Sequence, residues 1–340
     1  LTFYTGAYHL IGGGGKLRRL PLPESVDLAG FYAGRILFTL RDAWEVAGRT
    51  FPEGALLAID AEAFRESGEL PSIETVYTPD DRTSIEGVTV SRSGLYVSLL
   101  QNVKGSILRF GVEAKSGEWR AEPLPLPPSG TVSLSAANPH SGTVFVNYED
   151  HITPDRLSEY DAGANALTRL KALPARFRAD GLQVSQHTVR SADGETVPYF
   201  VIHRKGLKPD GSTPTILYGY GGFEISLKPS YSATIGKLWL ERGGAYAVAN
   251  IRGGGEFGPR WHKAALKTNR QRAYDDFIAV AENLAKRGIT SPKHLGISGG
   301  SNGGLLVGAI FTQRPDLMNA VVCRVPLLDM MRYTKLLAGA

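Results

Sequence analysis

The chain of 340 residues is 42% hydrophobic and 21% charged, with a formal net charge of +5 at pH 7. Its length allows two domains with sizeable cores, and its composition is typical of a globular protein. The basic side chains are scattered among acidic ones, which argues against a nucleic-acid-binding surface, and no apolar run approaches the ~18 residues that span a bilayer. We therefore expect no nucleic-acid or membrane partner. The compartment stays open, with the cytoplasm favoured.

Two features that can signal chemistry are interpreted here as structural. Cys323 is the only cysteine, which excludes an internal disulfide, and its apolar neighbours predict a buried, inert thiol. The glycines of residues 12–16 suggest a phosphate-binding loop, but Leu17 stands where Ser or Thr must hold magnesium. We interpret this stretch as the turn of a hairpin between residues 1–10 and 16–20, and we expect neither a cofactor nor a metal ion.

Residues 1–178 show short strands separated by turns. Three strands that each follow a glycine are succeeded by a second strand, and these second strands begin 51 and 50 residues apart, at residues 55, 106 and 156. A period of roughly 40 to 50 residues with four short strands is typical of propeller blades, whereas a β-sandwich, the alternative, needs no regular period. We predict a partial β-propeller over residues 1–178 whose first blades are missing, because only three to four blades fit in this length and a closed propeller needs at least about four.

Residues 179–340 alternate between strands and helices after an initial antiparallel pair. The pair covers 184–189 and 197–203; later strands are expected at 214–218, 245–250, 294–298 and 319–325, and helices at 232–242, 272–287 and 303–313. This alternation predicts a doubly wound α/β sheet. In such sheets the chemistry gathers in loops at the carboxyl ends of strands, and glycine-rich loops follow three of them, at 219–223, 252–256 and 299–303.

The third loop, Gly299-Gly300-Ser301-Asn302-Gly303, fits the G-x-S-x-G nucleophile elbow. A serine on such a strand–turn–helix junction stands clear of the sheet, and the next amide, that of Asn302, is aimed at the oxyanion. Tyr220, in the first loop, lies where hydrolases of this fold place a second oxyanion donor and can offer its hydroxyl. The structural alternatives are a helix-capping serine and a core tyrosine.

Two charged residues of the second loop are also candidates. Arg252 and Glu256 can bind a peptide terminus, but a structural ion pair that fixes the loop is the favoured interpretation.

The second half resembles the prolyl oligopeptidase family of serine peptidases. The matching motifs keep the family's order and spacing from about residue 180 onward: YGYGGF at 218–223, ANIRGGGE at 249–256 followed by Trp261 and His262, YDDF at 274–277, GGSNGGLL at 299–306 and QRPD at 313–316. The resemblance implies a propeller joined to an α/β-hydrolase domain over residues 179–340. It also implies that Ser301 is the nucleophile and that the Asn302 amide and the Tyr220 hydroxyl form the oxyanion hole.

The same resemblance implies the substrate pocket. Phe223 would line the apolar pocket for the residue before the cleaved bond, and Leu327 stands at another pocket position, although Pro326 beside it departs from the family pattern. The Ser301-Asn302 pair is similar to the proline-specific branch, which favours cleavage of short peptides after proline.

The catalytic set is incomplete in this sequence. Serine needs a histidine as general base and an acid that orients it, in the order Ser, Asp, His for this fold. Only Asp316 and Asp329 follow Ser301, no histidine does, and His262 and His294 match no triad position. We expect the triad Asp and His, with the last strands of the sheet, to lie beyond Ala340, and the chain alone to be inactive. A related serine exopeptidase or esterase, and a non-catalytic propeller interaction module, remain the alternative functions.

Overall fold

The structure is a computed structural model that describes residues 4–336. It divides into two compact units: the first is formed by Leu1–Tyr148 and Arg156–Ala172, and the second by Glu149–Asp155 and Leu173–Ala340. The short segment Glu149–Asp155 therefore belongs to the second unit, although it lies within the sequence of the first. No helix in the described part is long and apolar enough to cross a membrane.

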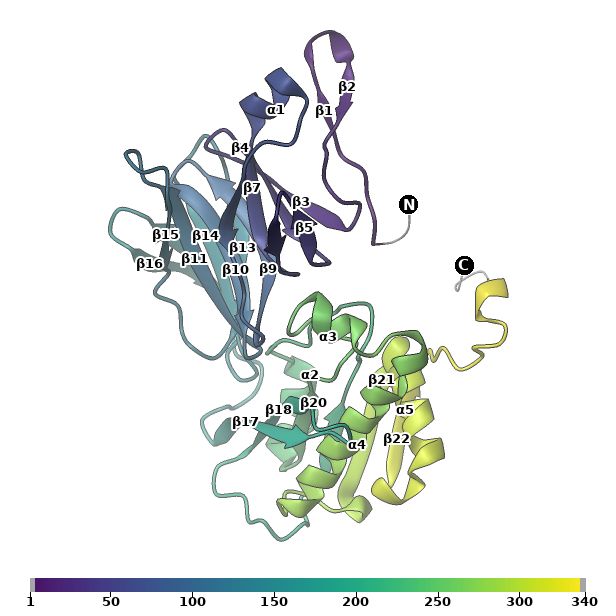
Figure 1. Ribbon diagram of the computed structural model, residues 1–340. Coiled ribbons are helices and arrows are strands. Elements are labelled where there is room, and N and C mark those ends of the chain that lie inside the picture. The colour runs from purple at the N-terminus through teal and green to yellow at the C-terminus, as the bar shows by residue number, and fades with distance from the viewer. Residues whose placement is uncertain (1–3, 337–340) are drawn as a thin grey trace. The chain divides into compact units, whose positions relative to one another are not determined.

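The first unit contains three four-stranded antiparallel sheets, and each follows chain order (Figure 1). The first sheet contains β3 (Val26–Tyr32), β4 (Arg35–Leu40), β7 (Leu56–Asp60) and β8 (Ile73–Tyr77). The second contains β9 (Thr83–Ser91), β10 (Gly94–Gln101), β11 (Lys104–Val112) and β12 (Trp119–Pro123). The third contains β13 (Thr131–Ala137), β14 (Val144–Glu149), β15 (Arg156–Asp161) and β16 (Ala166–Ala172). These sheets have the strand order of propeller blades, and the predicted partial propeller is confirmed.

The sheets pack face to face because successive side chains of a strand point to opposite sides. Leu95 and Val97 of β10 join a buried cluster with Leu37 of the first sheet, whereas Tyr96 joins a cluster with Val144 of the third. The central sheet thus contributes to two cores, which explains why β10 is apolar nearly throughout instead of alternating.

Smaller elements surround these sheets. The hairpin of β1 (His9–Ile11) and β2 (Leu17–Arg19) closes through the 3₁₀ turn Gly13–Gly15, so the prediction of a hairpin turn is confirmed where the structure describes it; residues 1–3 lie outside the described part. A second hairpin, β5 (Trp44–Val46) with β6 (Arg49–Phe51), lies between β4 and β7 in the sequence. The helix α1 (Ala61–Ser67), which the strand pattern missed, begins at the capping side chain of Asp60.

The second unit is built on one six-stranded sheet in the order β17-β18-β20-β19-β21-β22. Its strands are β17 (Leu182–Arg190), β18 (Thr196–Arg204), β19 (Thr215–Tyr218), β20 (Ala245–Ala249), β21 (Leu295–Gly300) and β22 (Ala320–Arg324). β18 is antiparallel to β17 and β20, and the last four strands are parallel. This confirms the predicted α/β-hydrolase sheet, whose carboxyl ends carry all three glycine-rich loops.

Helices cover both faces of this sheet unequally. The helices α4 (Gln271–Lys286) and α5 (Asn302–Gln313) pack together on one face (Figure 1). The predicted helix 232–242 is instead two pieces, α2 (Ala233–Leu238) and a 3₁₀ turn over Leu240–Arg242, interrupted at Trp239. A further short helix, α3 (Pro259–Lys263), follows the second glycine-rich loop and was not predicted.

The prediction of a buried thiol at Cys323 is wrong. Cys323 is half-buried on β22, the strand at one edge of the described sheet, and its Sγ lies 3.3 Å from the carbonyl oxygen of Gly304 in α5. Its neighbour Val322, which points to the opposite face, is 53% exposed. Apolar character alone could not distinguish this edge strand from a central one.

Candidate active site

Ser301 forms the sharp junction between β21 and α5. Its backbone has φ 56° and ψ −117°, a conformation that non-glycine residues rarely adopt and that is typically retained at functional sites. The junction is held on both sides, because the Ser301 N–H donates to Arg324 at 3.0 Å and its carbonyl accepts from Leu305 at 3.1 Å. The side chain is half-exposed, so Ser301 is not packed into the interior.

Asn302 is the first residue of α5 and is buried. The N–H of a first helical residue has no acceptor within its own helix, and the helix dipole adds partial positive charge there. The Asn302 side chain turns toward the loop after β19, where its Nδ2 donates to the Tyr220 carbonyl at 2.6 Å. The elbow and the Tyr220 loop are therefore hydrogen-bonded to each other.

Tyr220 lies directly against the first turn of α5. A Cβ placed on Gly303 would lie 2.6 Å from the Gly219 carbonyl oxygen and 3.5 Å from the Tyr220 ring, so only glycine allows this approach. Tyr220 is half-buried. The structure thus brings the predicted nucleophile, the Asn302 amide and the Tyr220 side chain to one end of the sheet.

Each predicted pocket residue is next to a residue that packs on the start of α5: Gly222 against Asn302, and Pro326 against Gly304. Phe223 is 48% exposed and has φ +53°, and Glu224 after it has φ +57°, so two successive side chains adopt the left-handed conformation. Leu327 is half-buried in the segment that follows β22. Its neighbour Pro326 packs so closely on α5 that a Cβ on Gly304 would lie 2.8 Å from the Pro326 Cα.

Arg252 forms the structural ion pair that we favoured, although Glu256 is not its partner. Its guanidinium bonds to Asp276 of α4 and to Asp193 of the β17–β18 turn, and Arg252 and Asp276 are 3% and 0% exposed. Burial lowers the pKa of Arg252, but the bonds to these two carboxylates outweigh it and raise that pKa. The hydrogen bond from Arg252 in turn lowers the pKa of Asp193. Because these two carboxylates occupy the guanidinium, we assign Arg252 no role in binding a peptide terminus.

Glu256, His262 and His294 have structural contacts. Oε1 of Glu256 accepts from the Leu227 N–H at 3.0 Å. Nδ1 of His262 lies 2.7 Å from the Gly253 oxygen and 3.1 Å from the Glu224 nitrogen, which ties the first and second loops together. His294 precedes β21, at the opposite end of that strand from Ser301. Neither histidine is placed as a general base for Ser301.

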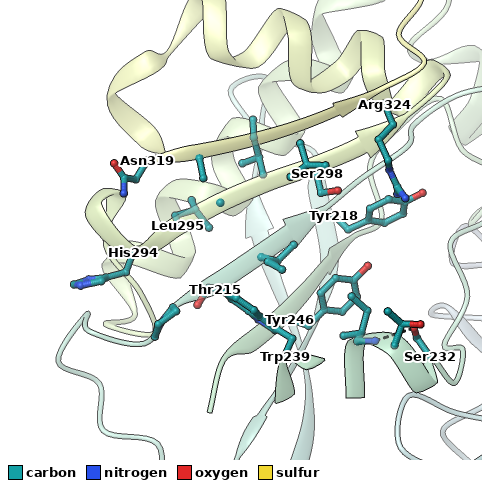
Figure 2. A pocket seen from close by; sticks show the side chains of 18 of the residues that line it. Thr215, Tyr218, Ser232, Trp239, Tyr246, His294, Leu295, Ser298, Asn319 and Arg324 are labelled. Atoms are coloured by element: carbon teal, nitrogen blue, oxygen red, sulfur yellow. Dashed lines mark hydrogen bonds between the residues drawn. The ribbon is translucent and has the colours of Figure 1, made fainter. Parts of the chain in front are cut away.

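The face of the sheet opposite α4 and α5 carries a pocket of about 860 Å³ (Figure 2). Figure 2 shows side chains from β19, β20, β21 and β22 around it, including Tyr218, Tyr246, Ser298 and Arg324. Burial raises the pKa of the Tyr246 hydroxyl. Ser301 is not among the residues that line this pocket, so it is separate from the candidate active site.

The sequence reasoning missed three residues that organise the site. Asp276 lies in the YDDF motif that carried part of the resemblance, but no role was inferred for it. Asp193 and Arg270 were not singled out, because each acts through contacts with residues 32 to 59 positions away. No local sequence pattern signals such contacts.

Comparisons with known proteins identify the family. Residues 229–337 match the description "Prolyl oligopeptidase family", and residues 44–172 match "Prolyl oligopeptidase, N-terminal beta-propeller domain". An uncharacterized peptidase of Sinorhizobium fredii is 48% identical over 322 residues, which are 94% of this chain and 44% of that protein. The prolyl endopeptidase of Elizabethkingia meningoseptica is 42% identical over 217 residues, or 64% of this chain and 31% of the relative.

A solved structure shows the same fold over nearly the whole chain. The post-proline cleaving enzyme from Rickettsia typhi superposes with a TM-score of 0.90 at 33% identity, covering 99% of this chain and 49% of that one. The chain thus spans about half the length of the relatives it matches.

Proposed function

The chain belongs to the prolyl oligopeptidase family, and on that premise we propose that the full-length protein hydrolyses short peptides through an acyl-enzyme on Ser301. The observation that carries the proposal is the backbone of Ser301, a partly exposed residue on a strained turn between β21 and α5. The Tyr220 loop, which is hydrogen-bonded to that turn, supports it further.

In the proposed reaction, Ser301 Oγ attacks the peptide carbonyl while a general base accepts its proton. The Asn302 N–H and the Tyr220 hydroxyl donate to the oxygen that becomes negatively charged in the tetrahedral intermediate. Collapse of the intermediate breaks the C–N bond, and the departing amine takes the proton from the base. A water molecule then attacks the acyl-serine ester, releases the acid and restores Ser301.

The general base is proposed to come from outside these 340 residues. All seven histidines precede Ser301 in the sequence, and the contacts of His262 and His294 place neither beside it. A serine without a base is a poor nucleophile, so turnover requires a histidine that this chain does not supply.

The proposed preference is for proline before the cleaved bond. The exposed Phe223 ring, which follows the Gly222 that packs against Asn302, offers a flat apolar surface of the kind that a pocket for a pyrrolidine ring requires. Relatives named prolyl endopeptidase and post-proline cleaving enzyme support this preference. Leu327, near the first turn of α5, is proposed to extend the same apolar lining.

Hydrolysis by the full-length protein tests this proposal. We expect turnover of an internal Gly-Pro-X peptide that is blocked at both ends, and loss of that turnover in Ser301→Ala. Ser298→Ala, which changes a serine three residues away on β21, is the control and should retain activity. Hydrolysis of unblocked peptides or of simple esters alone would assign an exopeptidase or an esterase instead. No hydrolysis of any of these would support a non-catalytic module.

A further inference from the structure

Arg270 and the side chain of Asn302 together hold the loop that carries Tyr220. Nδ2 of Asn302 donates to the Tyr220 carbonyl at 2.6 Å, and Nη1 of Arg270 donates to the next carbonyl, that of Gly221. Nη2 of Arg270 also donates to Oδ1 of Asn302 at 3.3 Å, so the two side chains are joined to each other. Two consecutive carbonyls of the loop are therefore captured by one hydrogen-bonded pair.

This loop needs an external restraint because of its composition. Gly219, Gly221 and Gly222 surround Tyr220, and glycine restricts the backbone less than any other residue. Fixing the carbonyls of residues 220 and 221 fixes the planes of two successive peptide bonds, and thereby the direction in which the Tyr220 side chain leaves the backbone. The contact is tight, since a Cβ on Gly222 would lie 2.3 Å from Nδ2 of Asn302.

The remaining contacts of Arg270 indicate that its guanidinium serves to hold the Tyr220 loop and the elbow. Its guanidinium carbon lies 5.4 Å from the centre of the Tyr274 ring, which fixes the side chain over an aromatic face. Within residues 4–336 no carboxylate pairs with Arg270, and its buried Nε has no hydrogen-bond partner. Its hydrogen bonds go to the Tyr220 loop and the elbow alone.

We propose that Arg270 and the Asn302 side chain are positioning residues that set the Tyr220 hydroxyl against the oxyanion. This inference rests on the proposed function. Asn302 then acts twice, with its backbone N–H toward the oxyanion and its side chain toward the loop that supplies the second donor. The roles of Arg270 and of the Asn302 side chain are specific to the transition state, because both act through a hydroxyl that is needed only when the negative charge develops.

A double-mutant cycle in the full-length protein tests the proposal. We expect Arg270→Ala to lower kcat on the blocked Gly-Pro-X peptide roughly 10- to 100-fold with KM changed less than about 3-fold, as for a displaced catalytic group. Tyr220→Phe should lower kcat about 100-fold, and adding Arg270→Ala to it should lower kcat by less than about 2-fold more. The proposal would be overturned if Arg270→Ala lowered kcat equally in the wild-type and Tyr220→Phe proteins, or if it raised KM alone.

Further variants separate positioning from general damage. A lysine at position 270 can donate to the Gly221 carbonyl or to Oδ1 of Asn302 but not to both, so Arg270→Lys should retain part of the kcat that Arg270→Ala loses. Asn302→Ala should behave like Arg270→Ala and show the same dependence on Tyr220. Lys286→Ala, which removes an exposed charge from the last turn of α4, should keep full activity.

Hydrogen exchange distinguishes failure of this inference from failure of the proposed function. Arg270→Ala should speed exchange of the amides in residues 219–223 at least 10-fold while α5 stays protected. Unchanged exchange in that loop would overturn the inference even if the wild-type protein is an active peptidase. If Arg270→Ala speeds exchange in this loop but the wild-type protein shows no Ser301-dependent hydrolysis, the restraint is supported and the peptidase function is refuted.

Discussion

At the scale of single residues, the backbone of Ser301 is the least usual feature of the site. A non-glycine residue at φ 56° and ψ −117° is destabilised by roughly 1–3 kcal/mol, and such strain persists only where the surrounding contacts enforce it. Here the Arg324 carbonyl and the first turn of α5 enforce it. The elbow motif predicted this turn from five residues, because G-x-S-x-G encodes the turn itself as well as the nucleophile.

The first prediction concerns Phe223. Phe223→Ala should lower kcat/KM for the Gly-Pro-X peptide about 10- to 100-fold, because covering an aromatic ring with a pyrrolidine contributes roughly 1.5–3 kcal/mol. Steady-state kinetics of the full-length protein measure this loss. Phe31→Ala, which removes a ring that is 53% exposed in the first unit, is the matched control. An unchanged kcat/KM would remove Phe223 from the proposed pocket.

At the scale of elements, Arg252 couples three segments of the second unit. It joins the loop after β20 to α4 through Asp276 and to the β17–β18 turn through Asp193. Removing one partner of a buried ion pair leaves an uncompensated charge in the interior. The loop between β20 and α4 therefore depends on α4 being in place.

Asp276→Asn should lower the free energy of unfolding by about 3–5 kcal/mol, because the buried Arg252 guanidinium loses the fully buried one of its two carboxylate partners. Urea denaturation measures this change. Asp275→Asn is the control on the same helix, since within the described residues the Asp275 carboxylate bonds with the exposed Gln271 side chain alone. A difference below about 1 kcal/mol between the two variants would contradict the structural role of the pair.

The sequence predicted long, periodic elements better than short ones. Helix 272–287 was recognised because its apolar residues repeat at helical spacing and Gly288 ends it. The strands from residues 35 to 161 were recognised because a strand that follows a glycine is succeeded by a second strand, and these second strands begin 51 and 50 residues apart. The five residues of α3 are too few to show a period. At the break, Nε1 of Trp239 donates to the Ala245 carbonyl at 2.7 Å, a contact with β20 that the helical periodicity does not signal.

The candidate site was predicted as a set of residue types but not as a network. Ser301, Asn302 and Tyr220 belong to recognisable motifs, whereas Arg270 bonds to residues 32 and 49 positions away in the sequence. Cys323 was assigned wrongly for a related reason, because burial of a strand depends on its neighbours in the sheet and not on its own composition.

At the scale of the whole molecule, each unit is stabilised by cores of its own, and a buried histidine makes the second unit sensitive to acid. His151 lies 7% exposed with its ring 5.3 Å from that of Phe200. Burial lowers the pKa of His151 from 6.5 to about 4, although the nearby Asp150 raises it slightly. The folded protein therefore keeps this imidazole neutral at a pH where the unfolded chain is protonated.

The sign of the resulting pH dependence follows from proton binding. Between pH 6.5 and 4 the unfolded chain binds the proton that folded His151 excludes, so stability falls as pH falls. We expect a loss of about 2 kcal/mol on going from pH 7.5 to 5, at about 1.4 kcal/mol for each pKa unit. Urea denaturation of wild type and His151→Phe at both pH values measures it. The role of His151 would be refuted if His151→Phe lost as much stability as the wild type between pH 7.5 and 5. It would also be refuted if His140→Phe, a change at an exposed histidine, reduced the loss as much as His151→Phe does.

A prediction at this scale concerns the missing base. The 340-residue chain alone should not turn over the blocked Gly-Pro-X peptide, because no histidine follows Ser301 in the sequence and the contacts of His262 and His294 place neither beside it. The full-length protein should turn it over under the same conditions. Steady hydrolysis by the isolated chain that disappears in Ser301→Ala would show that one of the seven histidines present can serve as the base.

The central claim is that the hydroxyl at residue 301 is an activated nucleophile. The most direct measurement is to treat the full-length protein with a fluorophosphonate and to map the adduct by mass spectrometry. We predict a single phosphonylated residue, Ser301, and no labelling of Ser301→Ala. Absence of an adduct on the folded protein, or an adduct on a different serine, would contradict the claim.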